Sequence, residues 1–140
     1  MKRLSFVSVL IILLSFFSTS CKKEKSAEEL IIGKWDVQDF TEVIYVGGIK
    51  TESYTYYLQP EELQFQFIDD GSGISYKDGD IDFAFEWTID NDTLTLINGE
   101  SKIEYTFTVD EGTLILSFSG SGTSDDGTAY TYDVFYNATR

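Results

Sequence analysis

From Trp35 onward, short segments of the chain alternate between apolar and polar residues, and this alternation restricts the fold more than any other feature. A period of two is typical of half-buried β-strands, because successive side chains point to opposite faces of a sheet. The clearest segment is residues 81–89, whose apolar positions are Ile81, Phe83, Phe85, Trp87 and Ile89. The same pattern predicts strands around residues 63–67, 103–109, 114–118 and 130–136.

Turn-forming residues separate these segments at short intervals. Asn98-Gly99 and Asp69-Asp70-Gly71 supply the positive φ angles that tight hairpins require. No helical period of useful length follows residue 33, so the sequence predicts an all-β domain, an antiparallel up-and-down meander of about eight or nine strands. Closing such a sheet buries its apolar face and removes both edges. We therefore expect a closed or nearly closed barrel, with a two-sheet β-sandwich as the alternative.

The first twenty residues have the three parts of a secretory signal. Lys2 and Arg3 give a positive start, residues 4–17 form an apolar run of 14 residues interrupted by three serines, and Ser18-Thr19-Ser20 are small. Fourteen helical residues span about 21 Å, which is less than the roughly 30 Å hydrocarbon core of a bilayer. The sequence thus predicts a cleaved signal peptide over residues 1–20.

The small residues that end at Cys21, the only cysteine of the chain, resemble the bacterial lipobox. The resemblance implies that the Cys21 thiol receives a diacylglyceryl group and that its amine is acylated further, for example with palmitate. The Cys-Lys-Lys start is similar to that of Bacteroidetes lipoproteins, and Lys22 implies the outer membrane. Residues 21–30 then form a lipidated, charged tether, in which the capping-box spacing of Ser26 and Glu29 predicts a helical turn through Ile31. Residues 31–140 form the β-domain.

The charge and the residue inventory exclude several functions. Removing Lys2 and Arg3 from a formal net charge of −14 leaves −16 for the mature chain, and no basic stripe offsets it, so we expect no nucleic-acid partner. The chain has no histidine, which removes Ser-His-Asp and Cys-His catalysis and the usual zinc sites. Asp78, Asp80 and Asp82 alternate as calcium ligands can, but the sixth residue from Asp78 is Phe83, where an EF-hand needs glycine. We expect a non-enzymatic protein with no cofactor and no metal.

Several short motifs resemble the lipocalins, and the small lipocalin-like domains of Bacteroidetes lipoproteins in particular. Ile32-Gly33-Lys34-Trp35 resembles the Gly-x-Trp start of a lipocalin, and residues 85–89 and 92–96 are similar to later segments of those domains. The resemblance implies that Gly33 and Trp35 are structural residues at one end of the barrel, with the tryptophan under an arginine from the last strand region. The only candidate, Arg140, lies beyond the predicted last strand, which argues against that contact.

The aromatic residues of the predicted inner face are the candidate ligand-binding residues. They are Phe65, Phe67, Phe83, Phe85, Trp87, Tyr105, Phe107 and Phe118. An eight-stranded barrel is just wide enough either to be filled by such side chains or to hold one small molecule, and both interpretations remain open. Tyrosines near the predicted strand ends (Tyr54, Tyr56, Tyr130 and Tyr132) could place hydroxyls at the mouth or be ordinary half-exposed strand residues.

These observations lead to one expectation and one alternative. We expect a lipoprotein of the cell envelope, anchored to membrane lipid through Cys21, that binds a small hydrophobic or amphipathic ligand. The alternative is a structural or protein-interaction module of an envelope complex, with a filled barrel and with binding residues on the outer strand faces and the 120–127 loop.

Overall fold

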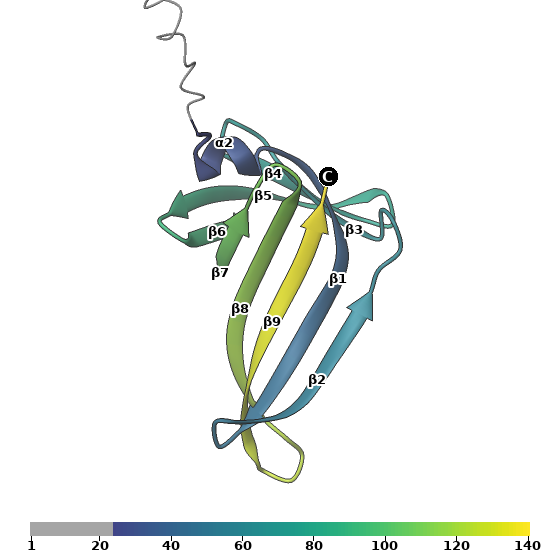
Figure 1. The fold of residues 1–140 in the computed structure, drawn as a ribbon, viewed down its shortest axis with the longest axis vertical. Coiled ribbons are helices and arrows are strands. Elements are labelled where there is room, and N and C mark those ends of the chain that lie inside the picture. Colours follow the sequence, from purple (N-terminus) through teal and green to yellow (C-terminus); the bar gives the residue numbers. More distant parts are fainter. Residues whose placement is uncertain (1–23) are drawn as a thin grey trace, which may run out of the picture.

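The computed structural model describes residues 24–140, so the predicted signal peptide, Cys21 and the first tether residues lie outside it. One short helix precedes nine strands in this part of the chain (Figure 1). They are α2 (Ala27–Ile31), β1 (Gly33–Val46), β2 (Ile49–Tyr57), β3 (Leu63–Phe67), β4 (Ser72–Lys77), β5 (Asp80–Asp90), β6 (Thr93–Asn98), β7 (Ser101–Val109), β8 (Thr113–Thr123) and β9 (Ala129–Thr139).

The strands form one antiparallel sheet that closes on itself. Neighbours from β3 to β9 pair in chain order, and β1 pairs with both β3 and β9, so eight strands make a closed barrel and β2 lies outside it. The all-β meander and the closed barrel predicted from the sequence are confirmed, and the sandwich alternative is wrong.

Strand β1 changes partner part of the way along its length. Residues 33–36 pair with β3 inside the barrel, whereas residues 39–46 pair with β2. The pairing of β1 with β9 shifts register between Val37 and Asp39, as a β-bulge does, and such bulges bend a strand and re-aim its side chains. Beyond this bulge, β2 and the distal parts of β1, β8 and β9 continue past the barrel as an open sheet (Figure 1). We call residues 39–57 and 118–136 the sheet extension.

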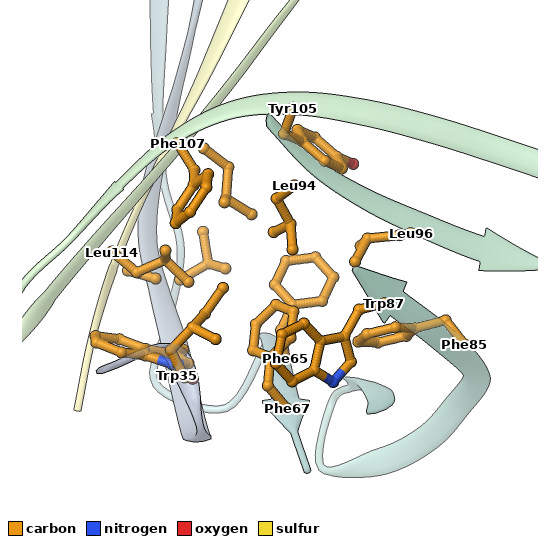
Figure 2. Close-up of a cluster of buried hydrophobic side chains, with 14 residues drawn as sticks. Trp35, Phe65, Phe67, Phe85, Trp87, Leu94, Leu96, Tyr105, Phe107 and Leu114 are labelled. Atoms are coloured by element: carbon orange, nitrogen blue, oxygen red, sulfur yellow. The ribbon is translucent and has the colours of Figure 1, made fainter. Parts of the chain in front are cut away.

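The barrel is solid at the end where β1 begins. Trp35, Leu94 and Leu114 have no exposed surface, and Phe67 is 1% exposed. Figure 2 shows these side chains converging from β1, β3, β6 and β8. Rings of Phe67 and Trp87 meet edge to face at 5.7 Å, a favoured aromatic geometry. We call this the closed end.

The helix α2 lies at this closed end (Figure 1). It begins with the predicted capping box: Ser26 Oγ accepts a hydrogen bond from the Glu29 amide, and the Glu29 carboxylate accepts one from the Ser26 amide. The helical turn predicted through Ile31 is thus confirmed, and it buries Ile31 completely against the barrel core. No helix of residues 24–140 has the length and apolarity needed to cross a bilayer.

One predicted strand face is wrong at a single position. Phe85 and Trp87 point inward as expected, but Ile81 does not share their face and is 67% exposed. The β4–β5 register shifts so that Ser75 faces Phe83 while Tyr76 faces Ile81, which leaves Asp82 as the extra residue of a bulge. A bulge reverses the alternation, and a pure period of two cannot reveal it.

Candidate ligand cavity

A cavity of about 420 Å³, partly open to solvent, occupies the end of the barrel opposite Trp35. Its lining is mainly aromatic and aliphatic, with a few polar groups. The lining residues are Leu63, Phe65, Ser75, Asp82, Phe83, Phe85, Leu96, Asn98, Ser101, Ile103, Tyr105 and Tyr136. A volume of a few hundred Å³ with apolar walls and few polar groups is typical of a small-molecule site.

The eight aromatic residues predicted as ligand-binding divide between the cavity and the solid core. Phe65, Phe83, Phe85 and Tyr105 line the cavity. The others do not line it. Phe67, Trp87 and Phe107 pack in the same buried core as Phe65, Phe85 and Tyr105, and Phe118 packs edge to face on Tyr105 with ring centres 5.7 Å apart. The filled and the hollow interpretations therefore each describe one half of the barrel.

Ser75 is the one inward-facing polar residue of the described part of the chain that solvent does not reach. Its side chain lies between Phe65 on β3 and Phe83 on β5, its exposure is 0%, and its Oγ has no hydrogen-bond partner. Leaving a buried hydroxyl unpaired costs about 1–3 kcal/mol. The other buried side-chain atom without a partner in residues 24–140, Gln64 Oε1, belongs to the opposite face of β3. Ser75 is thus a lining residue of the cavity whose hydroxyl has no hydrogen-bond partner within the folded chain.

The ring of Phe85 forms part of the cavity wall because its cross-strand neighbour has no side chain. Gly73 lies opposite Phe85, and a Cβ at residue 73 would approach Phe85 Cε2 to 2.2 Å and the Gln66 carbonyl oxygen to 2.8 Å. Phe85 can therefore fold down over β4, where it also contacts Phe65 and Phe67 edge to face. Glycine at position 73 therefore leaves room for the Phe85 ring, which lines the cavity.

Two tyrosines mark the side of the cavity that faces the sheet extension. Tyr105 and Tyr136 meet with ring centres 6.4 Å apart. Burial raises the pKa of Tyr105 to about 12, and the nearby Tyr136 adds to this shift; burial also raises the pKa of Tyr136. Both phenols are therefore neutral hydroxyls at physiological pH, able to donate or accept a hydrogen bond.

The aromatic contacts continue from the cavity along the inner face of the sheet extension. Phe40 lies against Tyr136 and stacks on Tyr56, and Phe118 contacts Tyr132, which lies beside Tyr130. The four tyrosines considered from the sequence therefore line this open face instead of the cavity mouth, and Tyr54 and Tyr56 are 45% and 49% exposed.

At the closed end, the structure corrects the expectation for Arg140. Strand β9 continues to Thr139, so Arg140 follows it directly, and its guanidinium lies 4.4 Å from the ring centre of Trp35. Arg140 Nη1 donates to the Ile32 carbonyl and Nε to the Glu111 carbonyl. Trp35 Nε1 donates to the Ile31 carbonyl at 2.7 Å. The tryptophan–arginine contact implied by the lipocalin resemblance is thus present.

Gly33 completes this arrangement through its backbone. Its φ of +129° is open to glycine but costly for other residues, and a Cβ there would lie 3.3 Å from Arg140 Nη1. Gly33 and Trp35 therefore lie together at the closed end of the barrel.

Sequence reasoning missed the other eight lining residues of the cavity, which are Leu63, Ser75, Asp82, Leu96, Asn98, Ser101, Ile103 and Tyr136. All eight lie in strands, and the sequence pattern assigns Ser75 to the polar face of its strand. No group of three or more acidic or other metal-ligating side chains gathers to hold a metal ion within residues 24–140. Comparison of the chain with protein-family models, curated proteins and solved structures finds no match.

Proposed function

We propose that the protein is a lipoprotein of the cell envelope, anchored in the outer membrane through acylated Cys21, whose lipocalin-like barrel binds a small amphipathic ligand without catalysis. The observation that carries the binding proposal is the pairing of an apolar cavity of about 420 Å³ with the buried, unpartnered hydroxyl of Ser75. A polar atom without a partner weakens a folded core, whereas in a binding site it fixes the orientation of the ligand.

The cavity chemistry defines the ligand. An apolar body fits among Phe65, Phe85 and Leu96. A hydroxyl, carbonyl or amide on that body would supply the hydrogen-bond partner that the Ser75 hydroxyl lacks. Three further polar residues line the cavity and can hydrogen-bond a second polar group of the ligand: Asp82, Asn98 and Ser101. The high negative charge of the chain favours a neutral or cationic ligand over an anionic one.

The cavity also bears on the alternative of a purely structural module. That alternative requires a filled barrel, and the barrel is filled only at the closed end. The cavity therefore favours ligand binding as the role of the barrel interior.

Ligand binding can be tested with a variant that fills the cavity and a variant matched to it. Ile103 lines the cavity, whereas Ile115 lies on the outer face of β8. The protein purified from membranes is examined by native mass spectrometry and solvent extraction, and it is titrated with a neutral apolar fluorophore. We expect Ile103→Trp to abolish both the extractable ligand and fluorophore binding, and Ile115→Trp to retain them.

Substitution of Ser75 tests the contribution of its hydroxyl to binding separately from that of the apolar cavity. We expect Ser75→Ala to weaken binding of the extracted ligand by about tenfold, the loss of one hydrogen bond, while fluorophore binding persists. Equal binding by the Ile103→Trp and parent proteins, or a parent that carries no ligand and admits no fluorophore, would falsify the binding proposal.

The helix α2, which follows the proposed anchor, lies at the end of the barrel opposite the cavity. The tether between Cys21 and α2 has five residues, which span at most about 18 Å when fully extended, and α2 lies at the closed end (Figure 1). The proposed anchor therefore holds the closed end near the bilayer and directs the cavity and the sheet extension away from it. A ligand from the aqueous side of the membrane fits this orientation.

The anchor is tested by fractionation. Two or more acyl chains give lasting attachment, at about 0.8 kcal/mol per buried methylene. We expect the parent to stay with membranes through a high-salt wash and Cys21→Ala to be released. A Cys21→Ala protein held as firmly as the parent would contradict lipidation at this residue without affecting the binding proposal.

A further inference from the structure

Strand β2 pairs along only one of its two edges. It lies beside β1 over residues 39–46, and no other strand of residues 24–140 pairs with it. All nine of its residues are exposed. An unpaired edge presents a row of free backbone N–H and C=O groups, which is a template for another strand.

The hydrogen bonds of β1 identify which groups of β2 face outward. The Leu58 amide donates to the Gln38 carbonyl, so residues 58, 56 and 54 point their backbone groups toward β1. The alternate residues Ser53, Thr55 and Tyr57 then point theirs to the free edge. The Thr41 and Thr55 hydroxyls lie 2.9 Å apart, which fits a close, non-hydrogen-bonded pair at that position.

The side chains of β2 favour strand pairing over its second half. Thr55 and the tyrosines have high β-propensity and there is no proline, whereas the features that protect an edge, Lys50, Glu52 and the register shift near Thr51, lie in the first half of the strand. Tyr57 is 80% exposed and Ile49 is 72% exposed. The other open edge of the sheet extension, residues 118–123 of β8, contains two glycines, which weaken a strand.

The charge of the sheet extension selects the kind of strand that this edge accepts. Residues 39–57 and 118–136 contain six acidic residues and one lysine, Lys50. Neither Glu42 nor Glu52 forms an ion pair with any of residues 24–140, and Glu52 instead accepts a hydrogen bond from the Tyr54 hydroxyl. Both line a hollow of about 260 Å³ at the far end of the inner face.

A second copy of the chain is a poor occupant for this edge. Pairing two β2 strands would bring together two sheet extensions with the same negative excess, in molecules of net charge −14. Like charges that face each other across a sheet are destabilising. Opposite charges both steer and stabilise an encounter.

We propose that the free edge of β2 binds an extended, lysine- or arginine-rich segment of a partner protein by strand addition. The backbone groups of Ser53, Thr55 and Tyr57 pair with the segment. The basic side chains that fall on the inner face lie over Tyr54 and Tyr56 and reach Glu52 and Glu42. This edge is separate from the ligand cavity, so the two proposals stand or fall independently.

The test uses the full chain in detergent and two nonapeptide probes, one alternating lysine with valine and one alternating glutamate with valine. We expect fluorescence anisotropy to detect the lysine peptide, more weakly as salt rises, and not the glutamate peptide. Hydrogen exchange should slow at the amides of Ser53, Thr55 and Tyr57 when the lysine peptide binds, and not at Ser121 on β8.

Substitutions at Ser53 separate strand addition from general attraction. Ser53→Pro removes an outward amide without removing a hydrogen bond to β1, and we expect it to weaken peptide binding at least tenfold. Ser53→Thr keeps the amide and should bind within about twofold of the parent. The double variant Glu42→Gln, Glu52→Gln leaves the backbone intact and should weaken binding several-fold, which keeps the test decisive if Ser53→Pro fails to fold.

Three results would overturn the proposal. They are equal binding of the lysine and glutamate peptides, undiminished binding by both Ser53→Pro and the double glutamine variant, and sedimentation of the peptide-free protein as a dimer that Ser53→Pro dissociates. The last would assign the edge to a second copy of the chain.

Discussion

The barrel and the sheet extension are made from the same long strands but from different residues. β1, β8 and β9 run through both parts, yet seven of the nine tyrosines lie in the extension: Tyr45, Tyr54, Tyr56, Tyr57, Tyr130, Tyr132 and Tyr136. The buried core of the barrel uses Trp35, Phe67, Leu94 and Leu114 instead. A core must exclude water on every side, whereas the inner face of the extension is covered on one side only.

Tyrosine suits a face of that kind. Its ring adds apolar contact at a low cost in conformational entropy, and its hydroxyl stays in water, which is why tyrosine, serine and glycine dominate adaptable binding surfaces. Tyr132 and Tyr130 lean across Gly120 and Gly122 on β8, and a Cβ at either glycine would lie within 2.6 Å of a ring atom. The rings thus shield an otherwise weak glycine-containing strand. The difference between the two parts predicts that stability is concentrated at the closed end.

The largest effect is expected for Trp35→Ala. Trp35 is fully buried, contacts Arg140 and donates a hydrogen bond, so its truncation should cost about 3–5 kcal/mol of unfolding free energy. Tyr56→Ala, which removes a half-exposed ring stacked on Phe40, should cost about 0.5–1.5 kcal/mol. Urea unfolding followed by fluorescence measures both. Comparable losses in the two variants would show that the extension bears as much of the stability as the barrel.

The next largest effect is expected at alkaline pH, which should lower the stability of the barrel. The folded-state pKa of Tyr105 is raised from 10.0 to about 12, chiefly by burial, so its stabilising contribution is complete below pH 10 and is lost as pH rises toward 12. Two pKa units correspond to about 2–3 kcal/mol. Tyr105→Phe should remove that part of the loss of unfolding free energy between pH 9 and pH 12. Urea unfolding at a series of pH values measures this loss.

Tyr54 is the control from the extension. Its pKa is also raised, first by its hydrogen bond to Glu52 and then by the charge of that carboxylate, but it is exposed to solvent, which screens the effect. Tyr54→Phe should therefore leave most of the alkaline loss in place. If Tyr54→Phe protected the protein as much as Tyr105→Phe, burial in the barrel would not be the cause.

Two glycine substitutions compare the packing of the barrel with that of the sheet extension, and their expected effects are smaller. A methyl group at residue 73 meets both the Phe85 ring and the Gln66 carbonyl, so Gly73→Ala should cost about 1–3 kcal/mol. A methyl group at residue 120 meets only the ring of Tyr132, which is half-buried and can swing away, so Gly120→Ala should cost less than about 1 kcal/mol. Thermal unfolding of the two variants tests this order, and the reverse order would mean that the extension is the more tightly packed part.

The barrel could be predicted from the sequence because its signals are local. Alternation in residues 63–67, 103–109 and 114–118 assigns the inward face correctly, and turn residues give the strand count. Strand number and hairpin connections then favour closure. Where alternation fails, as at Ile81, a bulge is the reason.

The sheet extension and the cavity could not be predicted in the same way. The change of partner of β1 from β3 to β2 coincides with the bulge after Val37, and the pattern of polar and apolar residues does not reveal this bulge. Ser75 looks like any polar strand residue, and its burial becomes visible only when β3, β4 and β5 are paired. Long-range register, rather than local pattern, decides which side chains meet in the cavity.

A similarly small effect is expected at Arg140, where the sequence argued against a contact that the structure contains. Arg140 stacks on Trp35 and donates to two carbonyls, but its own side chain is exposed, so Arg140→Ala should cost about 1 kcal/mol. Arg140→Lys should recover only part of this stability, because an ammonium group lacks the planar set of donors.

The control is Lys34, whose ammonium lies 4.2 Å from the ring centre of Tyr76 on the outer surface. Lys34→Ala should cost less than about 0.5 kcal/mol. Equal losses for Arg140→Ala and Lys34→Ala in urea unfolding would reduce the arginine to a surface cation and leave the closed end sealed by Trp35 and α2 alone.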